Sequence, residues 1–121
     1  MADALAVLVV DDDPEILTLM VDMLGEQFTT RGASGTDEAV TQLEQHPTDV
    51  LLSDVRMPGR NGLWLAGYVS ERWPATGIVL MSGYSSAFDE LEGTSWRLLR
   101  KPSHLEDIVA AVRKAAKPRQ K

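Results

Sequence analysis

The stretch Ala6-Val7-Leu8-Val9-Val10-Asp11-Asp12-Asp13-Pro14 decides the fold. Its first five residues are apolar without alternation, which is typical of a strand buried on both faces of a parallel sheet. Asp13 and Pro14 then supply an N-cap and the fixed backbone angle that begin a helix. The stretch therefore predicts a buried strand that passes through an acidic turn into a helix.

The same strand and helix unit recurs along the chain. Four more runs predict strands: about Phe28–Arg31, Val50–Leu52, Ile78–Met81 and Arg97–Leu99. Helical spacing and caps predict five helices: Glu15–Leu24, Asp37–Gln45, Leu63–Arg72, Gly83–Ser95 and His104–Ala116, the last with Ser103 and Glu106 as a capping box. Five such units predict a single doubly wound α/β domain over residues 1–121, with a core at about 5–116 and a basic tail at 117–121.

Composition excludes several classes of function. The 121 residues carry a formal charge of −6 and no cysteine, which excludes disulfide frameworks, thiolate catalysis and cysteine zinc sites. Residues 1–54 hold 12 acidic residues and one base, Arg31. An acidic chain without a basic stripe is not expected to bind nucleic acid directly. The longest apolar run, Ala4–Val10, is too short for membrane insertion and no basic signal start precedes it, so we expect a cytoplasmic domain.

Polar residues follow the carboxyl ends of the predicted strands. Asp11 and Asp12 follow the first strand, Asp54 the third, Ser82 the fourth and Lys101 the fifth. In an open parallel sheet these ends lie on one edge, where ligands bind at the switch point of the topology. The second strand ends without a reactive side chain, as expected if it lies outside the first. We therefore predict the strand order 2-1-3-4-5.

Together these residues predict a phosphoryl-transfer site. Taken singly, each aspartate could equally be a turn former or a helix cap. Three carboxylates at one edge repel one another, however, and need a positive partner. Lys101 is one candidate, and Mg²⁺ is a better one because it prefers oxygen ligands and bridges carboxylates to phosphate. An aspartate can itself be the nucleophile and form an aspartyl phosphate.

Four motifs resemble those of the receiver domains of bacterial two-component response regulators. They are Val-Asp-Asp-Asp-Pro at Val10–Pro14, Asp-Val-Arg-Met-Pro-Gly at Asp54–Gly59, Met-Ser-Gly-Tyr at Met81–Tyr84, and Lys101-Pro102. The resemblance covers about residues 5–116 and implies a flavodoxin-like three-layer sandwich. It implies a signalling phosphoacceptor rather than an enzyme, which a histidine kinase or a histidine phosphotransfer protein phosphorylates in a phosphorelay. Stand-alone receiver and terminal receiver of a hybrid histidine kinase both stay open, as does a homodimer.

The resemblance implies a role for each matching residue. Asp54 is implied to be the phosphoacceptor. Asp11 and Asp12 are implied to hold Mg²⁺ together with Asp54 and the backbone carbonyl of Arg56. Lys101 is implied to pair with Asp54 and then with the phosphoryl oxygens, as a point charge. Ser82 is implied to hydrogen-bond the phosphoryl group once it arrives.

The surroundings of the site carry further implications. Arg56 and Tyr84 take the two variable positions that flank the phosphoryl group and modulate its hydrolysis, which the domain catalyses itself. The peptide between Lys101 and Pro102 is implied to be cis, which aims the lysine. In this family an aromatic residue commonly stands where this chain has Leu98. The leucine predicts that phosphorylation is not read out by the ordinary aromatic switch.

The predicted first helix carries more apolar residues than one buried stripe requires. One interpretation is a generous core. The other, which the resemblance also implies, is a docking patch for a helical histidine-bearing partner. We favour docking, through Ile16, Leu19 and Met20.

Two rival functions share parts of this pattern. A small Mg²⁺-dependent phosphohydrolase with an aspartate nucleophile would use the Asp-x-Asp of Asp11 to Asp13, but it needs Thr or Val at Glu15 and a substrate-covering cap. A flavin-binding domain of the same topology needs a phosphate-cradling loop after the first strand. Three aspartates there would repel the phosphate instead.

Overall fold

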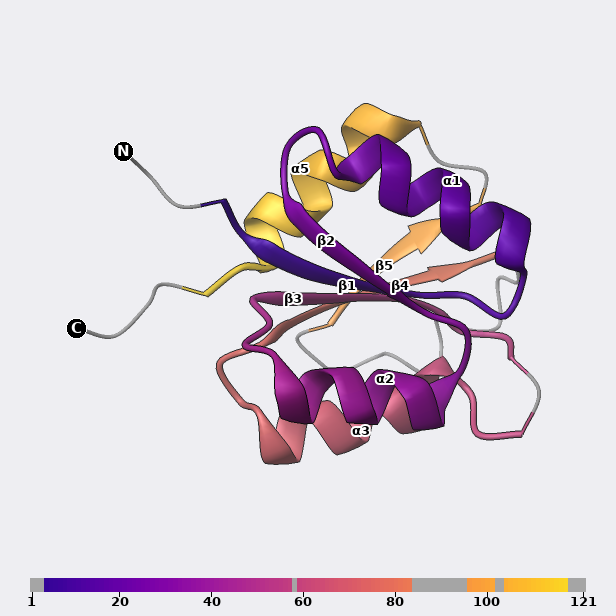
Figure 1. The fold of residues 1–121 in the computed structure, drawn as a ribbon, viewed down its shortest axis with the longest axis vertical. Coiled ribbons are helices and arrows are strands. Elements are labelled where there is room, and N and C mark those ends of the chain that lie inside the picture. The colour runs from indigo at the N-terminus through magenta and orange to yellow at the C-terminus, as the bar shows by residue number, and fades with distance from the viewer. Residues whose placement is uncertain (1–3, 58, 84–95, 102–103, 118–121) are drawn as a thin grey trace.

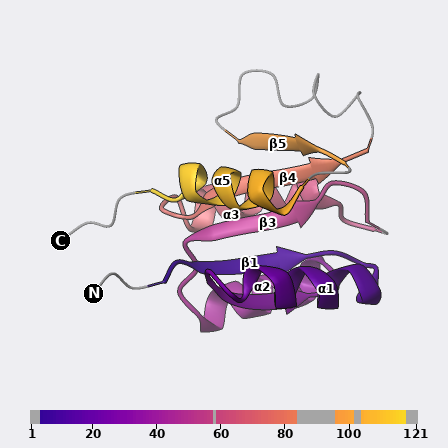
Figure 2. The ribbon, with the colours of Figure 1, turned by 90° about the horizontal axis from the view of Figure 1, so that it is seen from above.

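Five parallel strands form one sheet in the order β2-β1-β3-β4-β5. The structure is a computed structural model that describes residues 4–57, 59–83, 96–101 and 104–117. The strands are β1 Ala6–Val10, β2 Thr29–Ala33, β3 Val50–Asp54, β4 Gly77–Ser82 and β5 Arg97–Arg100. Every neighbouring pair is parallel. The strand order predicted from the sequence is therefore confirmed, and Figure 2 shows β1, β3, β4 and β5 side by side from above.

Helices cover both faces of the sheet and complete a three-layer sandwich (Figure 1). They are α1 Pro14–Leu24, α2 Thr36–Gln45, α3 Gly62–Arg72 and α5 Leu105–Ala115. Figure 1 places α1 and α5 on one face and α2 and α3 on the other. The predicted doubly wound α/β class is confirmed. The helix predicted for Gly83–Ser95 falls, after Gly83, outside the described residues.

The core lies in two clusters, one on each side of the sheet. Along β1, Leu8 and Val10 pack with the helices α2 and α3, while Val7 and Val9 pack with α1 and α5. All four side chains are buried. Because successive residues of a strand point to opposite faces, burying both faces requires a continuous apolar run. That requirement explains why the runs of the inner strands β1, β3 and β4 do not alternate.

Two helix starts show where capping prediction succeeds and where it fails. At α1, the Asp13 side chain accepts hydrogen bonds from the backbone N–H groups of Glu15 at 2.9 Å and Ile16 at 3.3 Å, which confirms the predicted N-cap. At α5, the N-cap is His104, without a side-chain capping bond. The predicted capping box is therefore wrong, since α5 begins one residue later than that box requires; Ser103 itself lies outside the described residues.

None of the helices in the described ranges is both long enough and apolar enough to cross a membrane.

Candidate functional site

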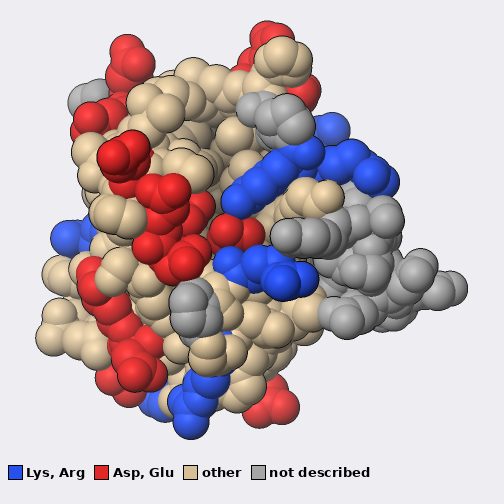
Figure 3. All heavy atoms as spheres, turned by 90° about the vertical axis from the view of Figure 1, so that its right-hand side faces the viewer, with Lys and Arg blue, Asp and Glu red and all other residues tan. Residues whose placement is uncertain are grey.

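The carboxyl ends of the strands bring the predicted polar residues to one edge of the sheet. Asp11 follows β1, Asp54 ends β3, Ser82 ends β4, and Lys101 follows β5. Figure 3 looks at the right-hand side of Figure 1 and shows acidic side chains on one part of this surface and basic side chains beside them. The expectation that these residues meet at one edge is borne out by the sheet.

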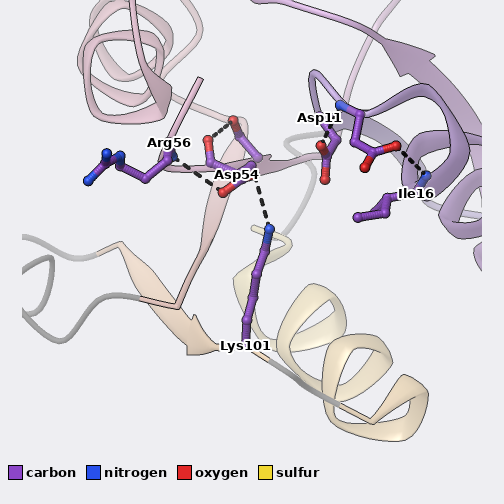
Figure 4. Close-up of polar contacts among 7 residues, drawn as sticks. Asp11, Ile16, Asp54, Arg56 and Lys101 are labelled. Carbon is purple, nitrogen blue, oxygen red and sulfur yellow. Dashed lines mark hydrogen bonds and ion pairs between the residues drawn. The ribbon is translucent and has the colours of Figure 1, made fainter. Parts of the chain in front are cut away.

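Asp54 and Lys101 form an ion pair at the centre of this edge. The Lys101 Nζ lies 3.0 Å from Asp54 Oδ2, with 12% of the Asp54 side chain and 31% of the Lys101 side chain exposed. The other carboxylate oxygen of Asp54, Oδ1, accepts a hydrogen bond from the backbone N–H of Arg56 at 3.3 Å (Figure 4). Both oxygens of the carboxylate are thus held by donors, which orients it in the site.

Backbone contacts hold the two partners in place. The Lys101 N–H donates to the Ser82 carbonyl at 2.9 Å, which extends the pairing of β4 with β5 up to the lysine. Val55, directly after the aspartate, donates to the Met81 carbonyl at 2.9 Å in the same way. These bonds continue the hydrogen-bonding pattern of the sheet past the ends of the strands. The sheet therefore fixes the backbone that carries Asp54 and Lys101.

Gly62 supports the aspartate from the other side. A Cβ atom at this position would lie 2.2 Å from the Asp54 carbonyl oxygen and 3.0 Å from Val55 Cα. The Gly62 N–H also donates to the Val55 carbonyl at 2.9 Å. A glycine is therefore required for α3 to begin directly against the end of β3. The sequence did not single out Gly62, because a close approach of two backbone segments leaves no side-chain pattern.

Asp11 is the buried acid of the site, with 4% of its surface exposed. Burial raises the pKa of its carboxyl above the ordinary value, and the nearby charge of Asp54 raises it further. The backbone N–H of Asp13, which donates to Asp11 Oδ1 at 2.9 Å, acts in the opposite direction. The positive charge of Lys101 also lowers the pKa of Asp11, but it does not cancel the effect of burial.

Three carboxylates are arranged so that they could hold a metal ion. Asp11, Asp12 and Asp54 each offer an oxygen, and these oxygens lie within 4.8 Å of one another. The donors are hard oxygens on a partly exposed edge, and Mg²⁺ commonly binds such carboxylates while keeping several waters. Asp13 is not in this group, because its side chain caps α1. The donor set thus fits Mg²⁺.

Other predicted site residues stand at the margins of this arrangement. Ser82 is buried at the end of β4, next to the ion pair in the sheet. Arg56 is exposed beside Asp54. Tyr84 and Pro102, and with Pro102 the predicted cis peptide, lie outside the described residues. Leu98 is half-buried and packs on the core on the α2 and α3 side.

The predicted docking residues differ in exposure. Ile16 is 41% exposed and Leu19 is 56% exposed on α1. Met20 is half-buried and packs against the core cluster on the α1 and α5 side. The structure therefore leaves Ile16 and Leu19 available at the surface, while Met20 is in large part a packing residue.

Comparison with known proteins gives one family. The model of the response regulator receiver domain matches residues 7–113. The response regulator protein PilR of Pseudomonas aeruginosa is 33% identical over 118 residues, a match that covers 92% of this chain and 26% of PilR. The DNA-binding transcriptional regulator NtrC of Salmonella typhimurium is 32% identical, with 88% of this chain and 24% of NtrC covered. The chain thus spans about a quarter of the length of these relatives.

Solved structures agree on the fold. The response regulator protein TrrA of Thermotoga maritima, solved in complex with Mg(2+)-BeF, has a TM-score of 0.82 and 26% identity, over 92% of this chain and 98% of TrrA. The chemotaxis protein CheY4 of Vibrio cholerae has a TM-score of 0.83 and 23% identity, over 94% of this chain and 99% of CheY4. The second likeness shows the common fold alone.

Proposed function

We propose, from the premise that this chain belongs to the response regulator receiver domain family, that it accepts a phosphoryl group on Asp54 from a phosphohistidine partner. The partner would be a histidine kinase or a histidine phosphotransfer protein. One observation supports this most: the Asp54 carboxylate lies 3.0 Å from the Lys101 ammonium and also belongs to the group of carboxylates that it forms with Asp11 and Asp12. A nucleophile, a cation and a metal-ligand set therefore meet at one edge.

In the proposed transfer, a carboxylate oxygen of Asp54 attacks the phosphorus of the phosphohistidine. An O–P bond forms, the P–N bond breaks, and its electron pair returns to the imidazole of the donor. Lys101 begins in contact with the carboxylate, so its ammonium is placed to stabilise the negative oxygens of the transferred group. Ser82 would donate its hydroxyl to the same group after transfer.

Asp11, Asp12 and Asp54 would hold Mg²⁺, with the Arg56 backbone carbonyl as a further ligand. When bound, the ion would offset the carboxylate repulsion and help to neutralise the phosphoryl oxygens. The backbone N–H of Asp13 would keep Asp11 oriented toward this position.

The same groups would serve the loss of the phosphoryl group to water. Arg56 is exposed directly after the phosphoacceptor, and its N–H already contacts the Asp54 carboxylate. We propose that Arg56 and Tyr84 flank the acyl phosphate and set how readily water reaches it. Because Leu98 is packed on the core where an aromatic switch residue would stand, we propose that another surface reports phosphorylation.

Intact-mass spectrometry after incubation with acetyl phosphate and Mg²⁺ tests this function. We expect one added phosphoryl group on the wild-type chain, and none on Asp54→Asn or in the presence of EDTA. Asp37→Asn, an exposed acid of α2, is the matched control and should be labelled like the wild type. Unchanged labelling of Asp54→Asn would refute the assignment. Turnover of a phosphate ester would instead support the phosphohydrolase.

A further inference from the structure

A hollow lies at the amino ends of β4 and β5, at the edge of the sheet opposite the carboxylate site. It measures about 320 Å³, and pockets for small molecules run from about 300 to 1,000 Å³. The carboxyl-terminal end of α5 borders it, and Figures 1 and 2 place that end on the left. We call this space the α5 hollow. Its walls include Ile78, Trp96, Arg97, Lys114, Ala116 and Lys117.

The α5 hollow exists because β4 begins before β5. Strand β4 starts at Gly77, but its pairing with β5 begins only at Val79, opposite Arg97. The first two residues of β4 therefore extend beyond the start of β5. A Cβ atom at Gly77 would lie 2.0 Å from the Ala115 carbonyl oxygen, so the glycine allows the end of α5 to lie directly against β4. The backbone of the sheet and of α5 thus shapes the hollow.

Three cations surround the α5 hollow. Arg97 begins β5, Lys114 lies in the last turn of α5, and Lys117 follows that helix. A cation in the last turn also complements the helix dipole, but that effect does not account for Arg97 on the strand. Neither Arg97 nor Lys114 forms an ion pair with a described residue. The Lys117 ammonium donates to the Pro74 carbonyl and has further N–H donors for a ligand.

No acidic side chain is among the described residues that line the α5 hollow. Helix α5 carries Glu106 and Asp107 in its first turn and its bases in its last turn, so about 15 Å of helix separates the two charges. The exposed acid Glu71 follows Ser70 on α3 but does not line the hollow. An anion in this space therefore meets three cations without facing a carboxylate on the described walls.

Part of the wall is apolar. Ile78 is buried, and Trp96 is half-buried and packs on the core on the α2 and α3 side. The hydroxyl groups of Ser70 and Thr76 also line the hollow, but each already donates to a backbone carbonyl, at 2.9 Å and 2.8 Å respectively. The hydrogen bonds to an anionic group must therefore come from the arginine and the lysines, while an apolar body can lie against Trp96.

We propose that the α5 hollow binds a small organic phosphate monoester. The phosphate group contacts Arg97 and the two lysines, and the apolar body lies against Ile78 and Trp96. Arginine donates parallel hydrogen bonds to phosphate, and three cations match a dianion better than a monoanionic carboxylate. A long polyanion such as nucleic acid fits less well, because the whole chain has a formal charge of −6 and the hollow holds only a small group.

This site is independent of the proposed phosphoacceptor function. None of the described residues that line the hollow belongs to the carboxylate group of Asp11, Asp12 and Asp54. Binding can be measured in EDTA, where no Mg²⁺ is present to hold a phosphate at Asp54. The outcome therefore does not depend on the Asp54 assignment.

Isothermal titration calorimetry with phenyl phosphate tests the site. In EDTA we expect one binding site on the wild-type chain, with a Kd of about 1 mM or lower. Three partial probes should each bind at least about fivefold more weakly: inorganic phosphate lacks the apolar body, benzoate has a single negative charge, and phenol has none. A wild-type chain that binds no phenyl phosphate up to about 10 mM, or that binds any partial probe as tightly, would overturn the proposal.

Three variants test the location. Arg97→Gln and Lys114→Gln should each weaken phenyl phosphate binding by about fivefold, because each removes a charge-assisted hydrogen bond. Both side chains are exposed, so the circular dichroism spectrum should not change. Arg113→Gln is the matched control, since Arg113 shares the last turn of α5 but contacts Gln27 and Phe28 instead. Wild-type affinity in Arg97→Gln, or an equal loss in Arg113→Gln, would overturn the assignment to the α5 hollow.

Discussion

Lys101 and Asp54 lie 47 residues apart in the chain, yet Nζ and Oδ2 are 3.0 Å apart. The contact joins the acidic first half of the sequence, where residues 1–54 hold 12 acids, to the basic second half. It arises because β3 and β5 both end at the same edge of a parallel sheet, with β4 between them. The charge asymmetry of the sequence is in part a consequence of how the site is built.

Removing the cation of this pair should affect both stability and chemistry. Lys101→Met leaves the partly buried Asp54 without its partner, so we expect the free energy of unfolding to fall by about 1 kcal/mol. Labelling by acetyl phosphate should slow by about tenfold or more, because a preorganised cation for the phosphoryl oxygens is lost. Urea unfolding in EDTA and timed intact-mass measurements check the two effects.

Lys114→Met is the control for that variant, since Lys114 is exposed on α5 and is not part of the carboxylate site. It should change neither quantity appreciably. Equal stability and equal labelling rate for Lys101→Met and the wild type would show that the ion pair is incidental.

Gly62 and Gly67 form a matched pair on one helix. Gly62→Ala would place a methyl group 2.2 Å from the Asp54 carbonyl oxygen, so we expect a loss of about 1–3 kcal/mol of unfolding free energy and slower labelling of Asp54. Gly67→Ala meets open space and should stabilise the chain by up to about 1 kcal/mol. Urea unfolding compares the two variants. If both behaved alike, the close approach of α3 to β3 would not be what positions Asp54.

Asp11 should make stability depend on pH. Burial, reinforced by the charge of Asp54, raises the pKa of this carboxyl in the folded chain above the ordinary value of 3.8. The ionised form therefore costs stability above the folded pKa, and this cost disappears as the pH falls below the unfolded pKa. In EDTA at pH 7, Asp11→Asn should unfold at a higher temperature than the wild type. The difference should shrink as the pH falls toward 4.

Thermal unfolding between pH 7 and pH 4 measures this difference, with Asp37→Asn as the exposed control. Added Mg²⁺ should stabilise the wild type more than Asp11→Asn, because one ligand is lost in the variant. A lower unfolding temperature for Asp11→Asn in EDTA at pH 7 would contradict a costly buried charge.

The centre of the sheet could be predicted because β1, β3 and β4 are buried on both faces and so have continuous apolar runs. The ends of the strands were harder, because Asp54 and Ser82 look like turn residues although both belong to the ladder. The start of α5 at Leu105 was missed by one residue, because its N-cap is His104, which makes no side-chain capping bond.

The site could be predicted as a set of residues because topology alone places strand ends together. Its supports could not, since Gly62 matters through the Cβ atom that it lacks. Such an atom would lie 2.2 Å from the Asp54 carbonyl oxygen, and no side-chain pattern indicates that close approach. Which residues of α1 are exposed was also only partly predictable from the sequence. Whether Met20 packs inward or faces solvent depends on how α1 sits against β2 and α5, and it packs inward.

The two exposed apolar residues of α1 should govern transfer from a protein donor and leave transfer from a small donor unchanged. Ile16 and Leu19 lie close in sequence to the acidic turn of the site, on the same helix that Asp13 caps. The variant Ile16→Ala with Leu19→Ala should lower the rate of transfer from a phosphorylated histidine phosphotransfer protein by about tenfold, since truncating an interface anchor costs about 1–2 kcal/mol. Its labelling by acetyl phosphate should match the wild type, because that donor needs no docking surface. Gln45→Ala, exposed on α2, is the surface control. Docking through α1 would be excluded if the double variant accepted phosphate from the protein donor at the wild-type rate, or if both donors slowed equally.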